Sequence, residues 1–119
     1  VGAIEVFLSG PGLENWYEFC TGIKKNSREV VGLFRDGENE ATKIMDKYFE
    51  RTARAFSTFV NILDPDVIVL GGGMSDIDEI YNEIPKKIIP YLASDIFSTP
   101  ITKAKHGSSS GVRGAAHLW

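Results

Sequence analysis

Four aliphatic residues run directly into three glycines in the stretch Val67-Ile68-Val69-Leu70-Gly71-Gly72-Gly73-Met74-Ser75. The run is bounded by Pro65 and Gly71 and is mostly β-branched, which is typical of a strand buried on both faces of a parallel sheet. Ligands gather at the carboxyl ends of such strands, where glycines let the backbone come close to them. A helix N-terminus after the bend would favour an anion such as phosphate. A plain tight turn explains the glycines equally well, and the spacing fits neither a P-loop nor a dinucleotide fingerprint.

The segments before this strand have helical patterns. Apolar residues recur at steps of three and four over 41–63, which predicts a helix of about 25 residues that ends at Asp64-Pro65. Asn26 and Glu29 have the spacing of a capping box for a shorter helix, ended by Asp36-Gly37. We expect residues 4–20 to form a helix in two pieces, separated around Gly10-Pro11.

After the strand, Ser75 and Asp78 have the spacing of an N-cap and a first-turn acid. They predict a helix that is kinked or restarted at Pro85 and ends near Tyr91. A second strand over 101–105 and a last helix over 112–118 follow. Two parallel strands joined by a right-handed crossover are too few for a stable sheet, so we expect strands from elsewhere to complete it.

Composition restricts the class of protein. The chain has 119 residues, 43% of them hydrophobic, a formal net charge of −3 and one cysteine, Cys20. These values predict one soluble domain in a reducing compartment, the cytoplasm, and exclude an intrachain disulfide and a basic nucleic-acid surface. No run is long and apolar enough to span a membrane, so a small molecule or a protein is the expected partner. The apolar start without Met indicates a fragment that begins inside a fold, or a processed or trimmed chain.

Few other residues suggest chemistry. The loop His106-Gly107-Ser108-Ser109-Ser110-Gly111 follows the second predicted strand and could face the same crevice, or be a flexible connection. His106 lacks a partner at catalytic spacing, and His117 is expected to be packed or at the surface. Cys20 is expected to be a small core residue. Glu5 is an acid in the first turn of the first predicted helix, where the helix dipole would stabilise it.

Three strings resemble the C-terminal part of the ROK family of sugar kinases, and within it bacterial fructokinases and N-acetylglucosamine kinases. They are Gly2-Ala3-Ile4-Glu5 with Ser9-Gly10-Pro11-Gly12-Leu13, the stretch from Asn61 to Ser75, and the stretch from Lys105 to Ala116. The resemblance covers essentially the whole chain. It implies the C-terminal lobe of an actin-like, hexokinase-like (ribonuclease H-like) α/β ATPase fold, helix-rich with a short parallel βαβ unit, and residues 1–119 as a single domain.

The resemblance also implies the site. Gly71, Gly72 and Gly73, with Met74 and Ser75 beside them, would line the adenosine and α-phosphate side of an ATP site. Glu5 matches the glutamate that accepts hydrogen bonds from sugar hydroxyls, a task suited to a carboxylate. The catalytic aspartate and the loops for the β- and γ-phosphates belong to the absent N-terminal lobe. We therefore expect phosphoryl transfer from Mg²⁺-ATP to a hexose by the full-length protein and no activity from this chain alone.

One position departs from the family pattern. Ala3 stands where the family has a cysteine that joins two other cysteines and a histidine around a structural zinc. The usual four-ligand zinc site therefore cannot form in full, which would leave Glu5 less firmly placed.

The sequence leaves the sugar open among fructose, glucose, mannose and N-acetylglucosamine. A ROK transcriptional repressor or a non-catalytic sugar sensor is the alternative function, and the intact glycine run favours the kinase. An interaction domain without chemistry is a third class. An apolar docking face on this chain would be covered either by the N-terminal lobe of the same protein or by a second copy in a homodimer.

Overall fold

The computed structural model describes residues 2–105 and the backbone of residues 112–118. It contains a four-stranded sheet in the order β3-β2-β1-β4, and every neighbouring pair is parallel. In chain order the elements are β1 (Ala3–Leu8), α1 (Pro11–Thr21), α2 (Ser27–Arg35), α3 (Asn39–Leu63), β2 (Val67–Gly71), the 3₁₀ helix η1 (Gly73–Asp76), α4 (Ile80–Lys87), the 3₁₀ helix η2 (Ile89–Tyr91), β3 (Ile101–Lys103) and β4 (Val112–Leu118).

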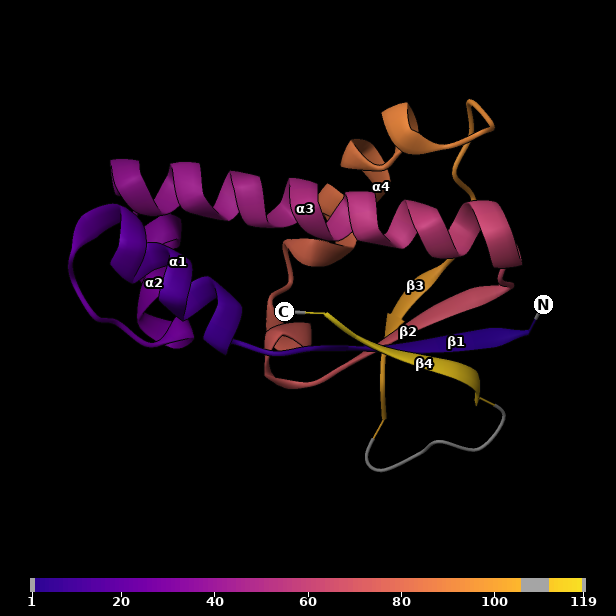
Figure 1. Cartoon of the computed structure of the whole chain (residues 1–119), viewed down its shortest axis with the longest axis horizontal. Coiled ribbons are helices and arrows are strands. Elements are labelled where there is room, and N and C mark those ends of the chain that lie inside the picture. Colours follow the sequence, from indigo (N-terminus) through magenta and orange to yellow (C-terminus); the bar gives the residue numbers. More distant parts are fainter. Residues whose placement is uncertain (1, 106–111, 119) are drawn as a thin grey trace.

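The core lies between one face of this sheet and the helices. Alternate residues of β1 and β2 point into it and are at most 3% exposed. These residues are Ile4, Val6, Leu8, Ile68 and Leu70. They join the apolar face of α3 and the isoleucines of α4 in one cluster, and both helices lie on the same side of the sheet (Figure 1). The position of α3 is therefore set by burial of its apolar stripe against the sheet.

Several predicted elements are confirmed. The strand over 67–70 is β2, the strand over 101–105 contains β3, and the two are parallel neighbours. The predicted long helix is α3, whose 25 residues end at Leu63, immediately before Asp64 and Pro65. The capping box at the start of α2 is present, with both of its reciprocal hydrogen bonds.

The first and last predicted helices are wrong. Residues 4–8 form β1 rather than a helical piece, because Ala3–Leu8 pairs with β2 on one side and β4 on the other. Residues 112–118 form β4. β1 and β4 therefore add two strands from within this chain to the two that were predicted. The expectation that strands from elsewhere must extend the sheet beyond two strands is wrong. Glu5 consequently lies on an interior strand, and its predicted place in the first turn of a helix is wrong.

The helix after β2 also begins later than predicted. Ser75 does not cap it, because residues Gly73–Asp76 form the separate turn η1 and α4 starts only at Ile80. Pro85 lies inside α4, and η2 ends at Tyr91. No helix in the described part of the chain is long and apolar enough to cross a membrane.

The fold brings one end of the sheet to the helices α1 and α2. The carboxyl ends of β1 and β2 both point toward this pair (Figure 1), and η1 begins two residues after β2. This is the edge at which ligands bind in parallel α/β sheets.

Candidate functional site

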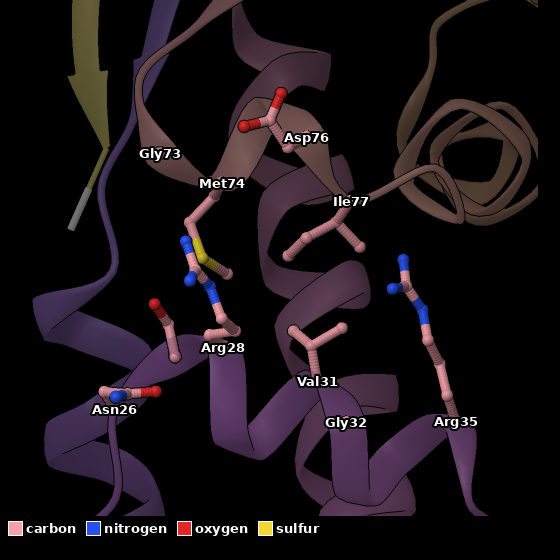
Figure 2. Close-up of a pocket in the computed structure, with 10 residues that line it drawn as sticks. Asn26, Arg28, Val31, Gly32, Arg35, Gly73, Met74, Asp76 and Ile77 are labelled. Carbon is pink, nitrogen blue, oxygen red and sulfur yellow. The ribbon is translucent and has the colours of Figure 1, made fainter.

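A pocket of about 650 Å³ lies between α2 and η1 at this edge of the sheet. Figure 2 shows its two walls, one from α2 and one from the segment that follows the glycine run. The lining residues are Asn26, Ser27, Arg28, Val31, Gly32 and Arg35 on the first wall and Gly73, Met74, Asp76 and Ile77 on the second. The pocket therefore joins the predicted glycine loop to a helix that is about 40 residues distant in sequence.

The α2 wall is fixed by hydrogen bonds at its N-terminus. The Asn26 side chain accepts from the Glu29 amide at 2.8 Å, and the Glu29 carboxylate accepts from the Asn26 amide at 3.0 Å. The carboxylate of Glu14 on α1 accepts from the Ser27 amide at 2.7 Å. A Cβ at Gly10 would lie 2.7 Å from the Ser27 hydroxyl, so glycine is what lets β1 turn into α1 beside α2. These contacts hold two helix starts together.

The η1 wall is a tight turn that only glycine can begin. Gly72 has φ +84° and ψ 173°, a region reserved for glycine. A Cβ there would lie 2.4 Å from the Leu8 carbonyl oxygen, so the turn presses directly on the end of β1. The Ser75 hydroxyl donates to the Gly72 carbonyl at 2.6 Å and closes the turn. Gly72 is thus required by packing, whatever it binds.

Further contacts hold this turn from behind. The Tyr81 hydroxyl donates to the Ser75 carbonyl at 2.6 Å. Burial, reinforced by the nearby carboxylates of Asp76 and Asp78, raises the pKa of Tyr81 to about 12. Tyr81 therefore stays a neutral donor throughout the physiological range, and the geometry of η1 does not depend on pH through this group.

Glu5 lies beside the glycine run on the sheet face opposite the core. It is opposite Val69 on β2 and Ala115 on β4, and it is 7% exposed. Its Oε2 would be 3.8 Å from a Cβ at Gly71, and such a Cβ would also meet the Phe7 ring at 3.1 Å. Within the described residues its carboxylate has no hydrogen-bond or ion-pair partner. A carboxylate with so little exposed surface is costly to bury unless donors reach it, so Glu5 is a candidate to bind hydroxyl or amide hydrogens.

The charged side chains that line the pocket differ in whether they have an ion-pair partner. Arg35 makes a bidentate pair with Glu79, with Nε and Nη2 each 2.9 Å from a carboxylate oxygen. That hydrogen-bonded pair raises the pKa of Arg35 and lowers that of Glu79. Asp76 is paired with Lys103 on β3. Among the described residues Arg28 has no acidic partner, and its side chain extends toward Met74 (Figure 2).

The structure brings together most of the residues predicted for the site. Gly73 and Met74 line the pocket, Gly71 adjoins Glu5, and Gly72 begins the turn between them. Ser75 is 5% exposed and its hydroxyl is engaged within the turn, so its binding role stays a prediction. The α2 wall was not predicted. Its capping box identifies a helix start, but no local signal tells that this helix lies against the glycine loop.

Other candidate residues lie elsewhere. Cys20 is exposed on α1, so its prediction as a core residue is wrong. The loop from His106 to Gly111 lies outside the described residues, and so does the side chain of His117. The expectation that Ala3 leaves the family's zinc site incomplete stays a prediction. Within 2–105, no three His, Cys, Asp or Glu side chains gather as a metal site would require.

Comparison with known proteins gives a consistent result. The family model described as ROK family matches residues 1–119. N-acetyl-D-glucosamine kinases are similar to this chain over 98% of its length, with 44% identity for the protein of Vibrio atlanticus and 39% for that of Haemophilus influenzae. The chain spans only 39% and 38% of the lengths of these relatives.

Solved structures share the fold. A ROK hexokinase from Thermus thermophilus matches 87% of this chain with a TM-score of 0.71 and 23% identity, and the match covers 35% of that protein. A ROK family protein from Streptococcus pneumoniae, solved in complex with sucrose, matches 83% with a TM-score of 0.65 and 16% identity. The predicted hexokinase-like fold class is thereby confirmed. Since the family model covers every residue, the chain belongs to the ROK family.

Proposed function

We propose that this chain forms one lobe of an ATP-dependent sugar kinase and supplies part of its sugar and ATP sites. Residues 1–119 would be the C-terminal lobe, and an N-terminal lobe of the same protein would complete the cleft. The preferred acceptor is N-acetylglucosamine, because the relatives with 44% and 39% identity carry that name. Fructose, glucose and mannose are the other acceptors to test. The protein would act in the cytoplasm, where ATP is available.

The observation that carries this proposal is the position of Glu5. A buried carboxylate without a partner in the described residues lies beside Gly71, at the start of the loop that leads to the pocket. Carboxylate oxygens accept charge-assisted hydrogen bonds from two neighbouring hydroxyls at once, which is how a sugar ring is oriented. The same strand end therefore supports an acceptor on one side and a donor nucleotide on the other.

The nucleotide would bind along the glycine run and in the pocket. A Cβ at Gly73 would meet no atom within 4 Å, so the backbone there is open to a ligand. We assign Gly71, Gly72 and Gly73 to the adenosine and α-phosphate side, with Met74 in the pocket wall and Ser75 holding the turn. The chain contributes binding and orientation, which is most of what phosphoryl transfer requires from a protein.

Two parts of the reaction would lie outside the described residues. The group that removes the proton from the attacking sugar hydroxyl is assigned to the N-terminal lobe, because Glu5 is the only residue here assigned to the sugar. A divalent cation, Mg²⁺ by this proposal, would neutralise charge on the ATP phosphates when bound. The described residues offer no cluster of ligands for it, so it would be held by the phosphates and by groups elsewhere.

An ATP-dependent phosphorylation assay tests the proposal directly. The full-length gene product is supplied with N-acetylglucosamine, glucose, mannose and fructose in turn, and this 119-residue chain is assayed beside it. We expect turnover of an amino sugar or hexose by the long form and none by the chain alone. Sugar binding without turnover would instead support a sugar-responsive repressor or sensor. The absence of both sugar binding and turnover would refute a sugar-handling function.

A further inference from the structure

The η1 turn, which carries Gly73 and Met74 into the pocket wall, is held from its far side by a tyrosine. Tyr81 lies in the first turn of α4, and its hydroxyl donates to the Ser75 carbonyl at 2.6 Å. Ser75 is 5% exposed, so water has little access to its carbonyl as an alternative donor. Tyr81 itself is not among the residues that line the pocket. Its hydroxyl would therefore affect a ligand there through the turn rather than by contact.

The position of Tyr81 is fixed by the packing of its helix. Ile80 and Ile84 are fully buried in the core that α4 shares with α3 and the sheet. The Tyr81 ring packs against the same core, and its backbone amide donates to the Asp78 carbonyl at 3.2 Å. A side chain confined in this way loses little further freedom when its hydroxyl bonds to the turn. Tyr81 is thus a rigid link between the helical layer and the loop at the strand ends.

Other contacts of the turn constrain it in different ways. The Ser75 hydroxyl and amide both donate to the Gly72 carbonyl, at 2.6 and 3.1 Å, so they close the turn on itself. Asp76 pairs with Lys103 on β3, but both side chains are more than half exposed, and such pairs contribute little. The hydrogen bond from Tyr81 is shielded and directional, and it orients the turn relative to α4.

Loss of the Tyr81 hydroxyl would leave a buried carbonyl without this donor. An unsatisfied buried acceptor is costly, so the peptide group of Ser75 would rotate toward water. Gly73 and Met74 belong to the same four-residue turn and would move with it. Met74 is 2% exposed, but apolar packing of its side chain is non-directional and sets no orientation for the backbone. The backbone that faces the pocket would then be displaced.

We propose that Tyr81 is a positioning residue for the phosphoryl donor, which holds η1 in the orientation in which its backbone meets the nucleotide. This inference rests on the proposed function, in which the nucleotide lies along the glycine run. It gives a role to α4, which lies behind the loop and outside the pocket. Because Tyr81 acts through the turn, its hydroxyl should affect nucleotide binding and not the transfer step.

Tyr81→Phe in the full-length protein removes the hydroxyl and keeps the ring. We would measure the Kd of ATP by calorimetry, the KM values for ATP and N-acetylglucosamine, kcat and Tm, with the kinetics performed well below the Tm of every variant. We expect the Kd and KM of ATP to rise by about 3- to 10-fold, the loss of one neutral hydrogen bond. The kcat and the KM for N-acetylglucosamine should stay within about twofold.

Two control variants separate this role from a structural one. Tyr91→Phe removes a comparable hydroxyl, which donates to Glu50 at 3.2 Å and not to the turn, and should leave ATP affinity unchanged. Ile84→Val removes a buried methyl group from α4 and leaves the Tyr81 hydroxyl in place. It should lower Tm without raising the KM for ATP, so it shows what a loss of stability alone does.

The outcomes are distinct. Wild-type Kd and KM of ATP in Tyr81→Phe would overturn this inference and leave the kinase proposal standing. An equal rise of both constants in Ile84→Val would also overturn it, because the effect would then be one of stability. A wild-type protein that binds no ATP would refute the kinase proposal and this inference together.

Discussion

Glu5→Gln tests whether the buried carboxylate is there for a ligand. Glutamine has nearly the same shape and keeps one oxygen acceptor, so it changes charge and acceptor number rather than volume. The carboxylate is 7% exposed, and its Oε2 would be 3.8 Å from a Cβ at Gly71. The side chain is therefore already confined by the sheet, and the substitution should not displace the strand.

The expected loss follows from the hydrogen bonds that a carboxylate would accept. A bond to a charged group contributes about 1.5–3 kcal/mol, against about 0.5–1.5 kcal/mol for a neutral one. Exchanging two such bonds for one neutral bond should weaken binding by about 1.5–5.5 kcal/mol, or roughly 10- to 10,000-fold. We therefore expect the sugar KM of the full-length protein to rise by that factor, with the KM for ATP little changed.

The same substitution should not lower the stability of the protein without sugar. A carboxylate that is only 7% exposed is more costly to bury than an amide in the same place. We expect Glu5→Gln to have a Tm at or above that of the wild type, measured without sugar. A residue that merely supports the fold would lose stability instead.

The control is Glu40→Gln, an exposed carboxylate in the first turn of α3. It should alter neither the sugar KM nor Tm by more than a small amount, because surface charges near a helix start contribute only tenths of a kcal/mol. An unchanged sugar KM in a well-folded Glu5→Gln protein would refute the assignment of Glu5 to the sugar.

Three further outcomes follow from particular contacts. Gly72→Ala should lower the free energy of unfolding by about 3 kcal/mol or more, because it combines a glycine-only conformation with a clash at the end of β1, whereas Gly73→Ala should leave it unchanged in chemical denaturation. Asn26→Ala should cost about 1 kcal/mol in the same measurement by removing a helix cap. The pKa of Glu79 is lowered by its pair with Arg35, so the contribution of that pair is present above pH 4.5 and is lost as pH falls through the folded pKa. Because the pair is partly exposed, Glu79→Gln should reduce stability at neutral pH by at most about 1 kcal/mol and leave it unchanged below the folded pKa, as pH-dependent melting would check.

The sequence predicted those elements whose pattern is decided locally. The stripe of α3, the capping box of α2 and the aliphatic run of β2 each identify one structure by spacing or composition alone. The same holds for the glycine turn, because the positive φ of Gly72 is a local property that glycine readily adopts. These features could be predicted because their cause lies within a few residues.

The predictions were wrong for the two segments whose sequence is compatible with a helix as well as with a strand. In β1, Ile4, Phe7 and Leu8 have helical spacing, yet Ile4, Val6 and Leu8 also alternate. All three alternating residues are buried, whereas Phe7 is only half-buried. In β4, alanines and leucine favour helix, but pairing with β1 decides the outcome. Tertiary contacts select the strand in both cases, and no single-segment pattern contains them.

The pocket wall on α2 could not be predicted for a related reason. It exists because Glu14 and Gly10 hold the start of α2 against the end of β1, and these contacts span the loop between two helices. Only when this junction is formed does the face with Gly32 turn toward Gly73.

The correction to β1 strengthens the argument for Glu5. At a helix start its carboxylate would have been stabilised by the dipole whatever its purpose, so its presence would have carried little information. On an interior strand it is fixed by backbone pairing on both sides, opposite Val69 and Ala115, rather than by a place in the first turn of a helix. A strand also holds its side chains more rigidly than a loop would, which is what orienting a sugar hydroxyl requires. The burial of Glu5 is therefore more costly than the sequence suggested, and a ligand becomes the stronger explanation for it.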